Sequence, residues 1–385
     1  MDFELTPEEK AYQKELCEFL KREANEGVIA ETESMQGLGP YGRELLRKMG
    51  QRRLLAPSWP QEYGGRGLTY VAQAIMGDEM SYHRGPWPLD GIVIGPTLLR
   101  LGTDSQKEKY LTGIARGEIE FALGYTEPEA GSDVASVLLR AVEDGDEYIL
   151  NGQKVFNTEA HYGDYHWLLV RTDTSVAKHK GLSMFIVDLK SPGITIRPLI
   201  TSAGLRTNEV FYEDVRVPKE NIVGEKNRGW DVAMSALGSE RVMWTGDIKW
   251  GFDKLVEYIL EDKRFDDICA QNPWILDELA ELDIKIHIGR LLGYKAASMG
   301  DKGLTAIYEG SLSKVYVTET RQQLFSVAMQ ILGLYGQLSK GSKWAPLSGM
   351  IPREYLDSCR WNIVGGTSEI QRLIIALMGL ELPRK

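Results

Sequence analysis

The sequence predicts a protein of the α+β class in three parts: an N-terminal helical domain over residues 1–118, a central β domain over 119–226 and a C-terminal helical bundle over 227–385. Helix-start signals and apolar residues at helical spacing mark the first part. Short β-branched and apolar runs, separated by turn dipeptides, mark the second. Long segments of helical periodicity mark the third. A chain of 385 residues is too long for one compact core, which is consistent with two or three domains.

The first part contains two helix-start signals. Thr6-Pro7-Glu8-Glu9 is a capping box with proline at the first helical position, and both features satisfy free amides at a helix start. Thr103-Asp104-Ser105-Gln106 is a second capping box and predicts a helix through Tyr110 and Leu111. Behind the first box, apolar residues at helical spacing predict one buried stripe, formed by Tyr12, Leu16, Phe19 and Leu20.

The central part consists of short runs that are typical of strands. Asp144-Gly145 and Asn151-Gly152 are turn dipeptides whose tolerance of positive φ suits tight hairpins. Strands at such short intervals predict a small antiparallel barrel or sandwich. The predicted strands are Val137–Val142, Glu147–Leu150, Trp167–Arg171, Leu182–Leu189, Ile194–Leu199 and Glu209–Val217.

The last part is helical from Gly229 to the end of the chain. Two long segments, Trp274–Met299 and Leu304–Leu332, predict the principal helices of a bundle with short connections. No internal repeat is visible, so a solenoid is not expected.

Composition and charge argue against several classes of protein. The net charge of −10 argues against nucleic-acid binding, because phosphate recognition requires clustered Lys and Arg. No uncharged apolar stretch reaches about 18 residues and no signal peptide is apparent, so membrane insertion is not expected. The three cysteines show no CxxC spacing and the five histidines no HExxH pair. We therefore expect a cytoplasmic protein without a disulfide framework or a catalytic metal.

Three motifs carry a resemblance to a known family. Tyr125-Thr-Glu-Pro-Glu-Ala-Gly-Ser-Asp133 combines small and hydroxyl residues that suit a planar, polar ligand. Its residues alone are equally consistent with a loop that ends at an N-cap Asp. Together with Gly366-Thr-Ser-Glu-Ile-Gln-Arg372 and the segment from Arg206 to Gly224, it resembles the acyl-CoA dehydrogenase family over nearly the whole chain.

The resemblance implies FAD as cofactor and a fold with a central β-barrel and a C-terminal four-helix bundle. Phe156 takes the place of an aromatic residue, usually Trp, that flanks the flavin, although a plain core role is an alternative. The residues implied to contact FAD are Leu123, Tyr125, Thr126, Gly131, Ser132, Phe156, Thr158, Thr367 and Glu369, with Gln330 and Gly333 reaching a neighbouring subunit's FAD.

The substrate side of the resemblance is less complete. Ser132 and Arg241 are implied to contact CoA, although Arg241 is also placed to form a surface pair with Glu240. Trp87, Met243 and Trp244 suggest a bulky apolar acyl group, and core packing explains them equally well.

Two cofactor positions depart from the family pattern. Glu129 stands where glycine is common. The Arg-x-x-Phe-Gly segment, which usually holds a second FAD contact, is degenerate around Lys263-Arg-Phe-Asp266. The resemblance therefore gives no firm flavin contact from this last region.

The usual catalytic base is also absent. Many relatives carry a Glu in Tyr-Glu-Gly-Thr-Ser, whereas this chain reads Val364-Gly365-Gly366-Thr367. The N–H of Gly365 remains available for the thioester oxygen. Glu240 stands at a position that resembles the alternative base position of branched-chain and some long-chain members. Without the resemblance, it is an ordinary solvated Glu on a helix. Asp90 is a second candidate base near the distal acyl pocket, and its plain reading is an N-cap of the following helix.

Four functions follow from these observations. The first is α,β-dehydrogenation of a branched or cyclic acyl-CoA by a homotetramer, with an electron-transfer flavoprotein as the acceptor. A close variant is 1,4-dehydrogenation of an alicyclic enoyl-CoA of the cyclohex-1-ene-1-carboxyl-CoA type, with Asp90 as base. A flavin monooxygenase or oxidase on the same fold is a third, because fold alone does not decide chemistry. A non-catalytic subunit of a hetero-oligomer is the fourth.

Overall fold

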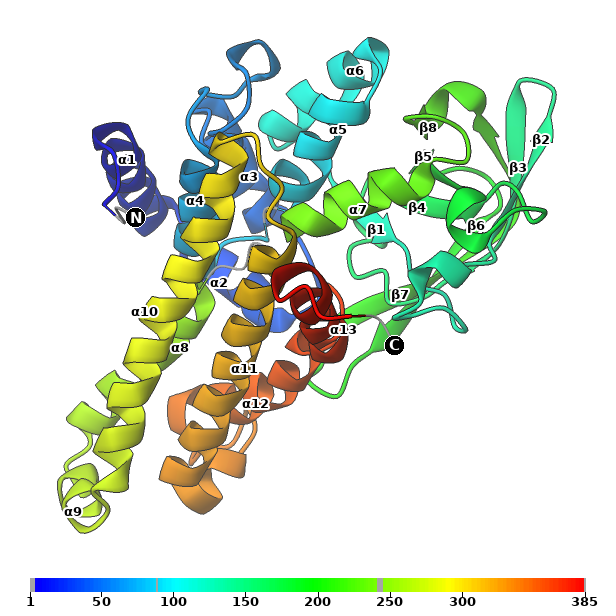
Figure 1. Ribbon diagram of the computed structural model, residues 1–385. Coiled ribbons are helices and arrows are strands. Elements are labelled where there is room, and N and C mark those ends of the chain that lie inside the picture. The colour runs from blue at the N-terminus through cyan, green and yellow to red at the C-terminus, as the bar shows by residue number, and fades with distance from the viewer. Residues whose placement is uncertain (1–3, 88, 241–244, 384–385) are drawn as a thin grey trace. The chain divides into compact units, whose positions relative to one another are not determined.

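The computed structural model describes residues 4–87, 89–240 and 245–383 (Figure 1). The chain divides into two compact units. Unit 1 comprises Met1–Arg22, Tyr70–Gly85 and Arg241–Lys385, and unit 2 comprises Glu23–Thr69 and Pro86–Glu240. Along the chain the elements are helical, then β, then helical, which confirms the predicted order.

Unit 1 is helical, and its first helix begins as predicted. The N–H of Thr6 donates to Oε2 of Glu9 (2.8 Å), and the N–H of Glu9 donates to Oγ1 of Thr6 (3.2 Å). The apolar stripe of this helix is at most 2% exposed, which confirms that prediction too. The α-helices of unit 1 are α1 (Pro7–Glu23), α4 (Tyr70–Tyr82), α8 (Gly246–Glu261), α9 (Arg264–Gln271), α10 (Trp274–Asp301), α11 (Ile307–Leu332), α12 (Met350–Trp361) and α13 (Ser368–Ile374).

A shared core joins the helices of this bundle. The long helices α10 and α11 run side by side and correspond to the two long segments predicted from the sequence (Figure 1). Four helices each contribute a fully buried aliphatic side chain to one cluster: Leu255 of α8, Leu282 of α10, Leu324 of α11 and Ile351 of α12. The implied four-helix bundle is therefore confirmed, since burial of these faces excludes water from one continuous core.

Most helices of unit 2 precede its sheet in the chain, and α7 follows it. The second predicted capping box is present, because Oγ1 of Thr103 accepts from the N–H of Gln106 and the Gln106 side chain accepts from the N–H of Thr103. Gln106 Nε2 also donates to the carbonyls of Glu220 and Ile222 at 2.8 Å, which ties its helix to the end of the β region. The helices are α2 (Glu26–Ser34), α3 (Pro40–Gln51), α5 (Gly95–Leu101), α6 (Asp104–Ala115) and α7 (Gly229–Glu240), with the π-helical turn η2 (Asp90–Ile94) before α5.

The sheet of unit 2 is mixed, whereas the sequence predicted antiparallel pairing throughout. The strand order is β6-β7-β3-β2-β4-β5-β8. Strand β1 pairs with β4 in parallel, and so does Arg140, the first residue of β2. Parallel pairing brings together strands that no short hairpin joins, so local turn signals did not indicate it. The strands are β1 (Phe121–Gly124), β2 (Arg140–Asp144), β3 (Glu147–Lys154), β4 (Tyr165–Arg171), β5 (Leu182–Asp188), β6 (Ile194–Ile200), β7 (Arg206–Pro218) and β8 (Ile222–Val223).

One of the two predicted hairpin turns is wrong. Asp144-Gly145 does turn the chain between β2 and β3, with Gly145 at φ 60°. Asn151-Gly152 instead lies inside β3, where the pairing with β7 shifts register. The Asn151 side chain exchanges two 2.9 Å hydrogen bonds with Asp214 of β7, so this dipeptide makes a β-bulge rather than a turn.

No helix in the described ranges has both the length and the apolar character that a membrane crossing requires.

Candidate functional site

Two segments of unit 2 that the sequence assigned to the same ligand lie against each other. The N–H of Val155 donates to the carbonyl of Thr126 (2.9 Å), and Nδ2 of Asn157 donates to the carbonyl of Leu123 (2.8 Å). Nζ of Lys154 donates to the carbonyl of Tyr125 (3.0 Å). We call the joined segments, Leu123–Glu127 and Lys154–Thr158, the platform. The fold thus brings the candidates Leu123, Tyr125, Thr126, Phe156 and Thr158 into one place.

The platform contains a buried ion pair. Lys154 Nζ lies 2.8 Å from Oε1 of Glu127, with the two side chains 0% and 7% exposed. The Glu127 carboxylate also accepts from the N–H groups of Leu138 (2.6 Å) and Leu139 (2.9 Å). Burial lowers the pKa of Lys154 to about 8, while the Glu127 charge acts in the opposite direction. Sequence reasoning missed both residues, although Glu127 is part of the motif that carried the resemblance.

Phe156 is presented to solvent from a strained backbone. Its side chain is 60% exposed, so the alternative of a plain core residue is wrong. Its φ is 61°, a left-handed conformation that is unusual for an aromatic residue. The neighbouring Asn157 and Asn208 hold this conformation, because the N–H of Asn157 donates to the Asn208 carbonyl (3.0 Å) and Nδ2 of Asn208 donates to the Asn157 carbonyl (2.8 Å). Strain held in this way is typical of ligand-binding positions.

The loop after Glu127 is open. Glu127 and Ala130 exchange backbone hydrogen bonds of 3.0 and 3.1 Å, and Gly131 and Ser132 beyond them are exposed. A side chain at Gly131 would meet no atom within 4 Å. Asp133 occupies the N-cap position of the short turn Val134–Ser136, as the alternative reading expects, but its side chain makes no capping hydrogen bond to the backbone. Its carboxylate instead contacts Ser136 Oγ (2.6 Å) and Lys178 Nζ (2.5 Å).

A buried histidine, His166, packs against β1, the strand that leads into the platform. His166 is fully buried on β4, the strand that pairs with β1, and its Nδ1 hydrogen-bonds to the hydroxyl of Tyr212. Burial lowers the pKa of His166 to about 3, so the ring is neutral at physiological pH. A side chain at Gly124 would lie 2.6 Å from Nε2 of His166, so the imidazole fills the space below β1.

Asp90 is buried in unit 2 and is not an N-cap. Its Oδ2 accepts from the N–H of Phe121, the first residue of β1, at 3.0 Å. Its Oδ1 is buried without a hydrogen bond of ordinary geometry in the described part of the chain. Burial raises the pKa of Asp90 well above its ordinary value, and the charges of Glu120 and Glu159 raise it further. Burial also raises the pKa of Glu120 to about 7, against its interaction with Asp90 and the charge of Arg43. Asp90 is therefore harder to ionise than an ordinary aspartate.

The C-terminal candidates lie in unit 1, where two glycines precede α13. Gly365 and Gly366 have φ values of 66° and 95°, which an L side chain rarely adopts. Nε2 of the fully buried Gln371 donates to the carbonyls of Gly365 (2.8 Å) and Gly366 (3.3 Å). Among the described residues the N–H of Gly365 meets no acceptor. Thr367 caps α13 through Oγ1, which accepts from the N–H of Ile370 (3.3 Å), and Glu369 is exposed on its first turn.

The remaining candidates are placed only in part. Gln330 is exposed near the end of α11, and Gly333 follows that helix with φ 55°. Trp87 is half-buried in unit 2. Glu240 is the last residue of α7, and its side chain lies outside the described residues, as do Arg241, Met243 and Trp244 altogether.

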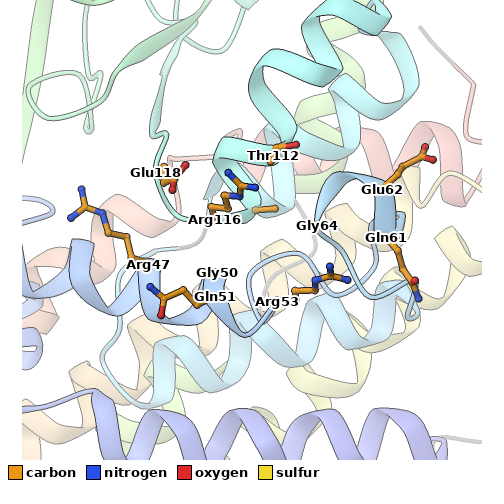
Figure 2. A pocket seen from close by; sticks show the side chains of 11 residues that line it. Arg47, Gly50, Gln51, Arg53, Gln61, Glu62, Gly64, Thr112, Arg116 and Glu118 are labelled. Atoms are coloured by element: carbon orange, nitrogen blue, oxygen red, sulfur yellow. The ribbon is translucent and has the colours of Figure 1, made fainter.

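A pocket of about 490 Å³ occurs elsewhere in unit 2 (Figure 2). Charged side chains surround it, including Arg47, Arg53, Arg116, Glu62 and Glu118. None of the candidate residues lines it, so it has no part in the site that the motifs indicate.

The platform fits a planar aromatic cofactor such as the implied FAD. An exposed aromatic ring on a rigid backbone offers a stacking face. Backbone groups of Tyr125 and Thr126 are held in place from behind by Lys154 and Val155. Open space at Gly131 allows close approach of a ligand to the backbone.

Comparisons with known proteins cover the whole chain. Three family models match in order: acyl-CoA dehydrogenase, N-terminal domain (residues 6–118), middle domain (122–215) and C-terminal domain (227–379). Acyl-CoA dehydrogenase FadE29 of Mycobacterium tuberculosis is 37% identical over 394 residues, which span 100% of this chain and 99% of FadE29. The solved Tcur3481-Tcur3483 steroid ACAD matches at 33% identity with a TM-score of 0.90 over 100% of both chains. The ChsE4-ChsE5 complex from Mycobacterium tuberculosis matches at 32% identity with a TM-score of 0.87, again over 100% of both chains.

Proposed function

The chain belongs to the acyl-CoA dehydrogenase family, and on that premise we propose that it dehydrogenates a branched or cyclic acyl-CoA thioester with Glu240 as the base. The enzyme is an acyl-CoA dehydrogenase, an oxidoreductase of an FAD-dependent family. The observation that carries the flavin-binding part of the proposal is the platform, where Phe156 is exposed at φ 61° and Lys154 and Glu127 form a buried pair. It gives this chain a rigid aromatic surface of its own for a flavin.

The cofactor residues follow from the platform. Leu123, Tyr125, Thr126, Phe156 and Thr158 hold the flavin ring. The more polar parts of FAD contact the exposed loop at Gly131 and Ser132 and the α13 residues Thr367 and Glu369. When bound, FAD supplies the acceptor for the substrate's β-hydride. Purified protein is expected to be yellow, and Phe156→Ala is expected to lose flavin on gel filtration while circular dichroism stays unchanged.

Two groups of the chain act on the thioester. The Glu240 carboxylate removes the α-proton, and the N–H of Gly365 donates to the thioester oxygen as negative charge develops there. Support for the second role comes from the Gly365 N–H, which no acceptor in the described part of the chain satisfies. In anaerobic mixing with substrate, Glu240→Gln is expected to slow flavin reduction by roughly 10²-fold or more. Reduction at the wild-type rate would rule out Glu240 as the base.

A second candidate function uses Asp90, and one observation favours it. Its carboxyl group is buried beside the start of β1, and burial raises its pKa, which makes its ionised form a stronger proton acceptor than an ordinary aspartate. A base in that position suits proton removal further along the acyl chain, as in 1,4-dehydrogenation of an alicyclic enoyl-CoA. Asp90→Asn keeps an acceptor for the Phe121 N–H and serves as the matched control for Glu240→Gln. Loss of flavin reduction in Asp90→Asn alone would establish this alternative in place of the first.

The acyl group is proposed to be bulky and cyclic. The Tcur3481-Tcur3483 protein is a steroid ACAD, and its structure matches the full length of this chain. The half-buried Trp87 offers an apolar surface of the kind that such a group requires. Anaerobic titration with straight, branched, alicyclic and steroid-derived acyl-CoAs tests this. Bleaching of the flavin by cyclic thioesters is expected, and bleaching by short straight chains alone would overturn the substrate assignment.

The chain is further proposed to work in an oligomer and to pass electrons to an electron-transfer flavoprotein. Family resemblance favours a homotetramer, whereas the ChsE4-ChsE5 complex supports an unlike partner subunit. Native mass spectrometry of the chain expressed alone distinguishes the two. A flavin-loaded, active tetramer supports the homo-oligomer. A flavin-free monomer or dimer that gains flavin and activity with a second acyl-CoA dehydrogenase subunit supports the hetero-oligomer.

A further inference from the structure

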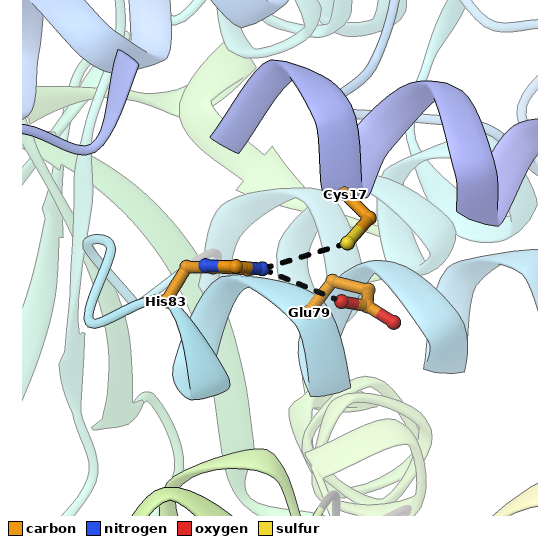
Figure 3. A group of neighbouring side chains, drawn as sticks. All are labelled: Cys17, Glu79 and His83. Carbon is orange, nitrogen blue, oxygen red and sulfur yellow. Dashed lines mark hydrogen bonds and ion pairs between the residues drawn. The ribbon is translucent and has the colours of Figure 1, made fainter. Parts of the chain in front are cut away.

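We propose that Cys17, Glu79 and His83 form a zinc-binding site that joins α1 to α4 in unit 1. The three side chains are half-buried, and Sγ, a carboxylate oxygen and a ring nitrogen all lie within 4.8 Å of one another (Figure 3). Glu79 and His83 stand four residues apart on and just after α4, so they share one face of it. Cys17 approaches that face from α1. Thiolate, imidazole and carboxylate are the three protein ligand types that zinc takes.

The distance between His83 and Glu79 suits a shared ion better than a direct hydrogen bond. Nε2 of His83 lies 3.8 Å from Sγ of Cys17 and 3.8 Å from Oε2 of Glu79. A nitrogen–oxygen hydrogen bond is typically about 2.7–3.2 Å long, so the His83–Glu79 contact is too long for one. Zinc bonds of about 2.0–2.3 Å give ligand–ligand edges of roughly 3.3–3.6 Å in a tetrahedron. The two 3.8 Å contacts of His83 Nε2 are therefore within a few tenths of an ångström of the edges expected around one zinc ion.

A second contact orients the carboxylate for this role. Nε2 of Gln13 donates to Oε1 of Glu79 at 2.9 Å, which leaves Oε2 directed at His83. Outer partners of this kind fix ligand orientation in metal sites. Gln13 and Cys17 are themselves one turn apart on α1, so one helix supplies both a ligand and the residue that positions another.

The charges of the proposed ligands match that of a zinc ion, and the nearby cation Lys21 opposes binding. A thiolate and a carboxylate together carry two negative charges, which neutralise Zn²⁺. Lys21, one turn beyond Cys17 on α1, is a cation whose field reaches His83 and opposes a bound cation. Lys21→Met is therefore expected to tighten metal binding. With three protein ligands, the fourth position is left for water.

None of the proposed dehydrogenase residues belongs to α1 or α4, the helices that carry the site. Its expected effect is to fasten α1 onto α4, so zinc should raise stability without being needed for flavin reduction. The sequence shows no motif because Cys17 and His83 are 66 positions apart. The sequence predicts no catalytic metal, and the zinc proposed here has a structural role instead.

Cobalt titration of the metal-stripped, reduced holoenzyme tests the proposal. Wild type is expected to bind one Co²⁺ with a thiolate charge-transfer band in the near ultraviolet, and Zn²⁺ should abolish the band by displacement. The band should disappear in Cys17→Ser and His83→Gln and persist in the control variants Cys269→Ser and Cys359→Ser, since those cysteines lie elsewhere. Affinity should fall by roughly tenfold or more in Gln13→Leu, in which Glu79 loses its orienting donor.

Thermal unfolding gives an independent readout. Saturating Zn²⁺ is expected to raise the Tm of the wild type by a few degrees, because a ligand that binds only the folded state stabilises it. The Tm of Cys17→Ser and of His83→Gln should not respond, with circular dichroism confirming that both fold. Absence of a charge-transfer band in folded wild type, or equal binding by His83→Gln, would overturn the proposal.

Discussion

The ammonium group of Lys154 lies 2.8 Å from a carboxylate oxygen of Glu127, and no part of the Lys154 side chain reaches solvent. This pair joins the two segments of the platform, because Lys154 also binds the Tyr125 carbonyl and Glu127 also binds two backbone amides of the following loop. A buried charge pair with all these partners holds a site in shape more than it adds net stability. Its removal should therefore affect folding and flavin binding together.

Lys154→Met is expected to destabilise the protein by about 3–5 kcal/mol, because it leaves the Glu127 carboxylate buried without its counter-charge. Urea unfolding measures the loss. The double variant Lys154→Met/Glu127→Gln should recover part of it. Lys178→Met, which breaks the exposed pair with Asp133, is the control and should change stability by less than about 1 kcal/mol. Equal effects of the two lysine substitutions would contradict a special role for the buried pair.

Phe156→Gly is expected to separate stability from flavin affinity. Glycine adopts φ 61° without strain, so the free energy of unfolding should stay within about 1 kcal/mol of wild type. Flavin affinity should fall by up to roughly tenfold, since aromatic stacking contributes about 0.5–1.5 kcal/mol. Phe156→Trp restores the aromatic that relatives usually carry and should retain flavin. Fluorescence titration of apoprotein with FAD gives the affinities, and an unchanged affinity in the glycine variant would remove Phe156 from the site.

His166 is expected to make the protein sensitive to mild acid. Its pKa is about 3 in the folded state against an ordinary 6.5, so below pH 6.5 the unfolded chain takes up a proton that the folded chain does not. Stability should fall by about 1.4 kcal/mol for each pH unit between 6.5 and 3 from this group alone. His166→Asn should flatten the slope, whereas His179→Gln, at an exposed site, should not. Urea midpoints at pH 4.5, 5.5 and 6.5 give the comparison.

Asp90 is expected to lower the stability of the folded protein as pH rises, whereas His166 lowers it as pH falls. Its folded-state pKa is raised by burial and by Glu120 and Glu159, so the folded chain keeps a proton that the unfolded chain has released. Its contribution is therefore lost as pH rises toward that folded-state pKa. Over the pH window above the ordinary value of 3.8, Asp90→Asn should lose less stability than wild type. Parallel slopes for the two proteins in that window would show that the carboxyl does not titrate there.

Gln371 is expected to control the backbone at the proposed thioester contact. Gln371→Leu removes two hydrogen bonds to the Gly365–Gly366 turn and should cost about 1–3 kcal/mol of stability. Flavin reduction should slow as the Gly365 N–H loses its fixed orientation. Gln371→Glu keeps the size of the side chain but not its donors, and should show the same loss. Wild-type reduction rates in both variants would separate this turn from catalysis.

Features that depend on neighbouring residues could be predicted from the sequence. Both capping boxes and the buried stripe of α1 form as expected, because a helix start and an amphipathic face are set by contacts within one or two turns. The family motif could also be recognised from the sequence, since its residues follow one another in the chain. The order of helical, β and helical parts followed from the same local periodicities.

Features that depend on distant residues required the tertiary structure. Asn151-Gly152 has the composition of a hairpin turn, yet its bond to Asp214 on another strand makes it a bulge. Asp90 has the position of an N-cap, yet its carboxylate binds the N–H of Phe121, 31 residues away. Local preferences of this kind are worth about 1 kcal/mol, and long-range pairing and burial override them.

The sequence by itself therefore determined the family, the α–β–α order and the helix starts. The tertiary structure decided which of the motif segments touch, that Lys154 and Glu127 are buried together, and that Cys17 meets Glu79 and His83. The reason is physical: helix propensity and capping act over a few residues, whereas desolvation and ion pairing depend on which distant groups the packed chain places within a few ångströms.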